Sequence, residues 1–164
     1  MLDLFILQGK YYQTGADTAT TDAKPAWRNL LEVSSLVLRE LDRRLDLEHR
    51  ISIREFDVLI NLDIPAADGL RMSDLASAVM LSSGGLTRLV GRLEGRGFLQ
   101  RTQDTVDARA FYAKLTDAGR ALLAEARVTH DAVIHERFGA YLSAGEVDAM
   151  TRALAGVLGS DRRT

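Results

Sequence analysis

The sequence contains no cysteine, which excludes disulfide bonds, thiol nucleophiles and zinc or iron–sulfur centres held by thiolates. Proline is scarce, with two residues in 164, and no apolar run approaches the ~20 residues that a helix needs to cross a bilayer. The apolar stretch Met1–Leu7 has no basic segment before it, so we expect no signal peptide. With 46% apolar and 27% charged residues, the composition predicts one globular, cytoplasmic domain without membrane contact.

Positive charge is unevenly distributed along the chain. The net charge of −2 by itself argues weakly against a nucleic-acid partner. Residues 71–120, however, hold eight basic and five acidic side chains, a net charge of +3, so the remainder carries −5. A basic centre between acidic ends is typical of proteins that bind polyanions.

The middle of the chain has the pattern of two short helices followed by two short strands. Ser73 is a suitable N-cap for the first helix, and Ser82 or Ser83 for the second. Glycines end the second helix, and two strands are expected, separated by the polar tip 103–108. The apolar stripe of the second helix consists of Leu86, Leu89, Val90 and Leu93. The two strands are expected at residues 98–101 and 111–115. This order predicts a winged helix-turn-helix, in a fold that is mostly α with a small β-hairpin wing.

Helical patterns also flank this middle region. Pro25 opens a long amphipathic helix, Thr116 is expected to cap another through about Phe138, and Ser143 with Glu146 forms a capping box before a last helix. These helices carry more apolar surface than the middle can cover, which indicates a second copy of the chain. We therefore expect four regions: a flexible tail (1–24), a first dimerisation helix (25–52), the winged helix-turn-helix (53–116) and C-terminal dimerisation helices (117–164).

One face of the second middle helix carries candidate DNA contacts. Opposite its apolar stripe lie small, hydroxyl and arginine side chains, which suit close approach to a major groove. The alternative is an ordinary solvated face, although several glycines at about 1 kcal/mol each are hard to explain there. At the hairpin tip, Asp107 could hold Arg109 extended toward the minor groove, or the two could form a surface ion pair only. The candidate residues are Ser82, Ser83, Gly84, Thr87, Arg88, Arg92, Asp107 and Arg109.

Two motifs in this region resemble those of MarR-type transcriptional regulators. Residues 82–97, SSGGLTRLVGRLEGRG, are similar to the family's recognition helix, and Asp107-Ala108-Arg109 followed by Leu115-Thr116 is similar to its wing signature. The resemblance implies a homodimer joined by its terminal helices. It also implies a repressor that binds a pseudo-palindromic DNA site and is released from the DNA by a small ligand. Gly91 stands where the family usually has a polar residue, and Thr105-Val106 replaces the usual proline-containing wing tip.

Some residues outside the DNA-binding region are candidates for binding a small ligand or a metal ion. The resemblance places ligand pockets between the terminal helices and the DNA-binding region, where Trp27, Arg28 and Phe56 could line a slot for an aromatic acid. The alternative, that Trp27 and Phe56 belong to a dimer core, is favoured by their apolar character. His130 and His135 are about 140° apart on a helix and cannot chelate one ion from one face.

No cofactor, metal or enzymatic activity is expected. The chain shows no phosphate loop, nucleophile elbow or convincing carboxylate pair. Because no thiol is present, the cysteine-based peroxide sensing of some family members is excluded. The alternative to a DNA-binding regulator is a winged-helix protein–protein adaptor without DNA affinity.

Overall fold

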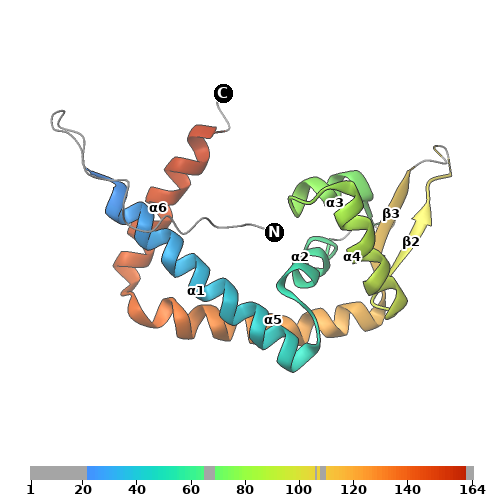
Figure 1. Ribbon diagram of the computed structural model, residues 1–164, viewed down its shortest axis with the longest axis horizontal. Coiled ribbons are helices and arrows are strands. Elements are labelled where there is room, and N and C mark those ends of the chain that lie inside the picture. The colour runs from blue at the N-terminus through green and yellow to red at the C-terminus, as the bar shows by residue number, and fades with distance from the viewer. Residues whose placement is uncertain (1–21, 65–68, 106, 108–109, 162–164) are drawn as a thin grey trace.

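The computed structural model describes residues 22–64, 69–105, 107 and 110–161. It is mostly helical with one small antiparallel sheet, which confirms the predicted fold class (Figure 1). The elements in chain order are α1 (Lys24–His49), α2 (Ile53–Asn61), β1 (Leu70–Arg71), α3 (Met72–Ala78), α4 (Ser83–Gly95), β2 (Leu99–Gln103), β3 (Phe111–Leu115), α5 (Asp117–Arg137), a 3₁₀ turn (Gly139–Tyr141) and α6 (Ala144–Asp161). None of the helices in these residues combines the length and apolar character of a membrane span.

We call α2, α3, α4 and the three-stranded sheet the head, and α1, α5 and α6 the arm. Figure 1 shows the head gathered at one end of α5, with α6 at the other end. The head has one continuous apolar core, and Leu45 of α1 together with Leu123 of α5 completes it. Six of the core side chains, from the second and fourth helices and from the strands, are almost fully buried: Phe56, Val58, Leu59, Leu86, Leu93 and Leu99.

The sheet contains a strand that the sequence pattern did not predict. β1 pairs antiparallel with β3, placing Leu70 opposite Ala113, and β3 lies between β1 and β2. The predicted N-cap at Ser73 is wrong because β1 leads into α3 two residues earlier, with Arg71 as the N-cap residue. Ser73 instead lies inside the first turn, where its backbone oxygen accepts from Ser77 Oγ at 3.1 Å.

The predicted caps of the other helices are confirmed. Ser82 Oγ accepts a hydrogen bond from Gly85 N–H at 3.2 Å, and Thr116 Oγ1 accepts one from Gly119 N–H at 3.1 Å. Ser143 and Glu146 exchange the two bonds of a capping box. Caps of this kind satisfy backbone donors that a helix leaves unpaired at its start.

A tight contact fixes the start of α5 against the head. Thr116 N–H donates to Phe98 O at 3.1 Å, and Thr116 Oγ1 donates to Gly97 O at 2.6 Å. Gly119 packs so closely that a Cβ at this position would collide with the Phe98 carbonyl. The wing and the long helix of the arm therefore meet at a rigid junction.

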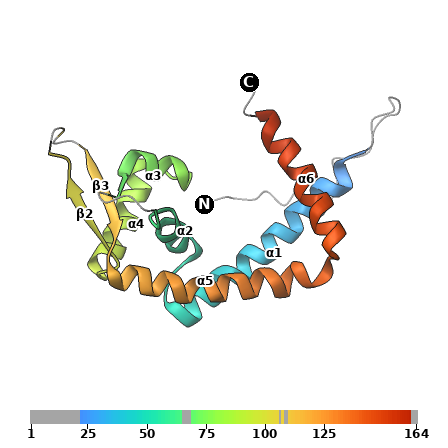
Figure 2. The same cartoon turned by 180° about the vertical axis from the view of Figure 1, so that it is seen from behind.

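The arm has a much smaller core of its own. Val37 and Leu41 of α1 pack on Val133 of α5, while α6 turns away from the end of α5 (Figure 2). Most other large apolar side chains of the arm remain exposed, including Trp27 (59%), Leu36 (58%), Val157 (67%) and Leu158 (67%). The predicted tail lies outside the described residues except for its last three positions, and the four region boundaries stay a prediction.

Candidate nucleic-acid interface

Helix α4 separates a buried face from an exposed one. Leu86, Leu89, Val90 and Leu93 are buried in the head core, as the sequence predicts. The opposite face is exposed to solvent and carries every predicted contact of this helix: Ser82 at the cap, then Ser83, Gly84, Thr87, Arg88 and Arg92. Because the apolar face is fixed in the core, the direction of the exposed side chains is fixed too.

The two arginines of this face differ in their surroundings. Arg92 Nε lies 3.4 Å from Glu55 Oε1, and Glu55 is a buried residue in the first turn of α2. Arg88 makes no hydrogen bond or ion pair with any residue that the structure describes. Arg88 therefore has an uncommitted guanidinium on the exposed face, whereas Arg92 is already anchored through one nitrogen.

The glycine at position 84 is not required by the fold. A Cβ added at Gly84 would meet no atom within 4 Å, and the backbone there does not need a positive φ. A glycine in a helix costs about 1 kcal/mol relative to alanine, so packing gives no reason for it. Close approach of an external backbone or base edge to the start of α4 would give one.

The end of α4 is braced against the wing. Arg101 of β2 donates from Nε to Glu94 Oε2 at 2.9 Å, a second guanidinium nitrogen reaches the same oxygen, and Arg101 N–H donates to Glu94 Oε1 at 3.1 Å. These hydrogen bonds hold the pKa of the Glu94 carboxyl below its ordinary value. Arg96 at the helix end lies 4.8 Å from the centre of the Phe98 ring. The bracing fixes the orientation of the wing relative to α4.

The wing carboxylate contacts an arginine that the sequence analysis did not single out. Asp107 Oδ2 lies 3.0 Å from Arg71 Nη2, which ties the wing tip to β1 and the start of α3. The backbone supports this position, because Asp107 N–H donates to Asp104 Oδ1 at 2.8 Å and Asp107 O accepts from Ala110 N–H at 2.8 Å. Arg109 lies outside the described residues, so the predicted Asp107–Arg109 contact stays a prediction.

The structure does not bring the three predicted ligand-binding residues together within one chain. Trp27 and Arg28 are exposed in the first turns of α1, about 27 Å along the helix from Leu45, where the head begins. Phe56 is 2% exposed in the head core, and its ring stacks on that of His130 with centroids 4.9 Å apart. Phe56 is therefore a core residue, and Trp27 lies on the arm's exposed apolar face.

Polar contacts between α1 and α5 lie beneath the head. Thr129 Oγ1 donates to Glu48 Oε2 at 2.7 Å and lies 2.8 Å from His49 Nε2. The hydrogen bond from Thr129, together with that from Arg44, lowers the pKa of Glu48. Within the described parts of the chain, no group of three or more His, Cys, Asp or Glu side chains is arranged to hold a metal ion.

Two features of the site escaped the sequence analysis although one had a visible signal. Ser52 and Glu55 form a capping box at the start of α2, with Ser52 N–H donating to Glu55 Oε2 at 2.9 Å. The spacing Ser-x-x-Glu predicts such a box, and the same glutamate then anchors Arg92. No comparable signal marks Arg71, because its contact with Asp107 depends on the pairing of β1 with β3.

Comparison with known proteins gives consistent results. A sequence model of the MarR family matches residues 51–111, which cover most of the head. The HTH-type transcriptional regulator PecS of Dickeya dadantii (strain 3937) is 36% identical over 109 residues. The match covers 66% of this chain and 64% of PecS, just under two thirds of that relative's length.

Solved structures share the fold over nearly the whole chain. A MarR family transcriptional regulator from Silicibacter pomeroyi is 31% identical, with a TM-score of 0.68, and the alignment covers 84% of this chain and 93% of that one. Sco3205 of Streptomyces coelicolor, a MarR family transcriptional regulator solved in complex with DNA, has a TM-score of 0.77 at 23% identity. That alignment covers 90% of this chain and 92% of Sco3205 and shows similarity of fold.

Proposed function

Because this chain belongs to the MarR family, we propose that it is a homodimeric, sequence-specific DNA-binding regulator that represses transcription from a pseudo-palindromic operator. In this proposal the exposed face of α4 enters the major groove, and the wing lies along the adjacent minor groove. The protein acts by binding and has no catalytic role.

The observation that carries this proposal is the uncommitted guanidinium of Arg88. Its helix is locked to the core on one face and braced to the wing at its end, so Arg88 is presented from a rigid support. A guanidinium in this setting can form two parallel hydrogen bonds to a guanine edge. The related fold of Sco3205 has been solved with DNA, which supports a nucleic acid as the partner of this face.

The homodimer is proposed from the arm. Trp27 and Leu36 on α1, with Val157 and Leu158 on α6, are all more than half exposed. Apolar side chains gathered on terminal helices favour burial against a second copy, whose twofold symmetry would place two α4 helices on two half-sites.

A small aromatic or phenolic ligand is proposed to release the DNA. Trp27, Arg28 and Phe56 remain the proposed lining of its site, although Phe56 is buried and Trp27 lies far along α1 in the same chain. A shared slot would need Trp27 from the partner copy, so this part of the proposal depends on the dimer.

The experiment that tests the function is selection of duplexes from a random-sequence pool, followed by titration of the selected site and of a shuffled duplex at several salt concentrations. We expect an inverted repeat to be enriched and bound at least about 10³-fold more tightly than the shuffled duplex. Affinity should fall as salt rises, because phosphate contacts release counterions. Failure to enrich any sequence, with no salt-dependent binding, would instead favour the protein–protein adaptor.

A further inference from the structure

A buried carboxylate lies beneath the exposed face of α4. Glu55, in the first turn of α2, is 7% exposed and is one of two buried polar or charged residues in the described part of the chain. Burying a charged group costs free energy unless hydrogen bonds and an opposite charge compensate for it. The contacts of Glu55 therefore indicate what the charge at this position does.

The two oxygens of this carboxylate have different partners. Oε2 accepts from Ser52 N–H at 2.9 Å and from Ser52 Oγ at 3.1 Å, which belongs to the capping box of α2. Oε1 accepts from Arg92 Nε at 3.4 Å, and Arg92 is the one cation that pairs with Glu55 among the residues that the structure describes. A capping box forms with glutamine as well as with glutamate, so the cap alone does not require a buried charge. The contact with Arg92 gives a reason for it.

The first turn of α2 is fixed to the arm. Ile53 N–H donates to Asp42 Oδ1 of α1 at 2.8 Å. The Glu55 carboxylate is thus held by its own cap and by the contact of α2 with α1, whereas the Arg92 side chain is 59% exposed. Because a side chain on a rigid support restricts a mobile partner, the carboxylate fixes the arginine rather than the reverse.

The shape of a guanidinium decides which donors remain available on Arg92. Its N–H groups lie in one plane, and those of Nη1 and Nη2 match two oxygens of a phosphate. Glu55 contacts Nε, and in the described part of the chain neither terminal NH2 group of Arg92 has a hydrogen-bond partner. Arg92 can therefore keep its contact with Glu55 and bind one phosphate at the same time.

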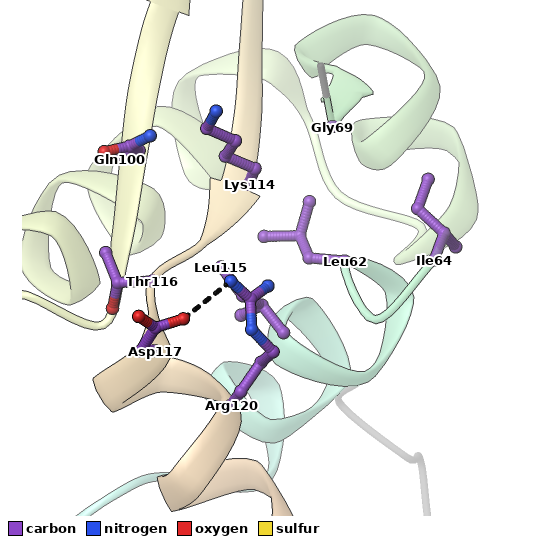
Figure 3. A pocket seen from close by; sticks show the side chains of 9 residues that line it. All are labelled: Leu62, Ile64, Gly69, Gln100, Lys114, Leu115, Thr116, Asp117 and Arg120. Carbon is purple, nitrogen blue, oxygen red and sulfur yellow. Dashed lines mark hydrogen bonds and ion pairs between the residues drawn. The ribbon is translucent and has the colours of Figure 1, made fainter. Parts of the chain in front are cut away.

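An ion pair at the start of α5 provides a contrast. Arg120 Nη2 lies 3.0 Å from Asp117 Oδ1, and Figure 3 shows the two side chains on one helix at the base of the wing. Both side chains are exposed, so solvent screens the pair and neither partner is held in place by its surroundings. Asp117 is therefore a control for the removal of a paired carboxylate that positions nothing.

On the basis of the proposed function, we propose that Glu55 is a positioning residue for DNA binding. Its carboxylate holds Arg92 through Nε and directs both terminal NH2 groups to one phosphate of the DNA backbone. The carboxylate acts through Arg92 and does not touch the DNA. Its negative charge by itself repels a polyanion, so simple electrostatics predicts tighter binding when the charge is removed, whereas loss of positioning predicts weaker binding.

Glu55→Gln separates the two roles of this residue, because glutamine supports the capping box but lacks the charge that holds Arg92. We expect binding to the selected operator and to the shuffled duplex to weaken alike, by about 5–10-fold, and the salt dependence to decrease as for loss of a phosphate contact. Anisotropy titrations at several salt concentrations measure both effects. Unchanged or tighter binding by Glu55→Gln would overturn the proposal.

Two further variants are matched controls. Glu146→Gln makes the same change in the capping box of α6, where the glutamate forms no ion pair with the residues that the structure describes. Asp117→Asn removes the exposed carboxylate that pairs with Arg120. Both should bind DNA like the parent, and circular dichroism verifies that all three variants remain folded. A loss in either control as large as that of Glu55→Gln would show that the effect is not one of positioning, and the proposal would be wrong.

Arginine Nε–H signals in the NMR spectrum test the contact without DNA. The Arg92 signal, identified by its loss in Arg92→Ala, should exchange with solvent more slowly in the parent than in Glu55→Gln. In DNA titrations, adding Glu55→Gln to Arg92→Ala should cause little further loss, because the glutamate acts through the arginine. Equal exchange rates or additive losses would overturn this proposal alone. A parent that bound no duplex would overturn the proposed function, and this proposal with it.

Discussion

The head and the arm differ in how far they bury their apolar side chains. The head encloses one continuous core, with Phe56, Leu86 and Leu99 each at most 2% exposed. The arm has three buried apolar residues in its own cluster and leaves Trp27 and Leu158 on the surface. The head thus buries its apolar side chains within one chain, whereas the arm leaves much of its apolar surface exposed, which supports the proposed burial against a second copy.

The polar contacts follow the same division. In the head, Glu94 and Arg101 join α4 to the wing, and Glu55 anchors Arg92, so charges fix the geometry of the proposed DNA-binding surface. In the arm, the ion pair of Arg44 with Glu136 links the surfaces of α1 and α5. Surface pairs of this kind contribute little stability, so in the proposed dimer the arm would depend mainly on apolar contacts with the second copy.

The largest effect is expected from changing the exposed apolar surface of α6. The double variant Val157→Asp, Leu158→Asp should convert the proposed dimer to an 18.0 kDa monomer, because it would bury four charges at a twofold interface. Binding to the selected operator should fall more than about 100-fold, since each half-site would be bound separately. Sedimentation and fluorescence anisotropy measure the two effects.

The control for this variant comes from the head. Met80 is 89% exposed, more than either α6 residue, so Met80→Ser removes a comparable apolar side chain without touching the arm. It should leave the sedimentation unchanged. If the parent protein itself sedimented as a folded monomer, the exposed apolar surface of the arm would not be a dimer interface, and the proposed difference between head and arm would be wrong.

The next largest effect is expected from Arg88→Ala, which tests the head alone. Loss of a two-pronged base contact should cost about 1–3 kcal/mol per half-site and should reduce affinity for the operator more than for a shuffled duplex. Arg92→Ala should weaken both duplexes alike, because Glu55 already holds the Arg92 guanidinium through Nε and leaves it less free than Arg88 to form a paired contact with one base. An equal loss on both duplexes for Arg88→Ala would make it a phosphate contact. Anisotropy titrations distinguish these outcomes.

The comparison also shows where sequence patterns were sufficient. The apolar face of α4, its cap at Ser82 and the strand at 111–115 were predicted, because each depends on residues a few positions apart. β1 was not, since the two residues Leu70 and Arg71 are too few to show a period.

The sequence patterns also did not predict contacts between residues far apart in the chain. Arg71 and Asp107 are 36 positions apart, and Glu55 and Arg92 are 37 apart, so both contacts depend on the assembled head. The proposed ligand slot also joins positions far apart in the chain. Within one chain Trp27 lies in the exposed arm and Phe56 in the closed core, so the slot stays a prediction that depends on the partner copy.

A smaller effect is expected at the wing. Asp107→Ala should weaken operator binding several-fold, roughly 3–10-fold, although it removes a negative charge from a surface that meets a polyanion. The carboxylate is proposed to orient an arginine, and the structure supplies Arg71 as one partner. Simple electrostatics predicts the opposite sign, so tighter binding by Asp107→Ala would contradict the orienting role.

Two double variants identify the arginine through which Asp107 acts. If it acts through Arg109, adding Asp107→Ala to Arg109→Ala should cause little further loss. If it acts through Arg71, the same non-additivity should appear with Arg71→Ala. Additive losses in both pairs would show that Asp107 orients neither. All variants should melt with the parent, because an exposed ion pair contributes little stability.

The smallest effect is expected in the arm, from the charge of Glu40. Hydrogen bonds from Arg43, and a weaker one from Arg137 of α5, lower the pKa of this carboxyl from 4.5 to about 2. A carboxyl whose pKa is lowered by folding stabilises the folded state fully when the pH is above the pKa of the unfolded chain. For Glu40 this contribution is lost as the pH falls from 4.5 toward 2. Because the pair is close to the surface, solvent screens it and the contribution is small.

Glu40→Gln should therefore melt slightly below the parent at pH 7, and the difference should shrink as the pH is lowered and vanish near pH 2. The matched control is Glu32→Gln, an exposed residue of the same helix that forms no ion pair with the described residues, and it should follow the parent at every pH. Melting curves recorded between pH 7 and pH 2 provide the measurement. A difference that persisted unchanged at pH 2 would mean that Glu40 stabilises the arm through packing or helix propensity. The charge of Glu40 would then contribute nothing to the stability of the arm.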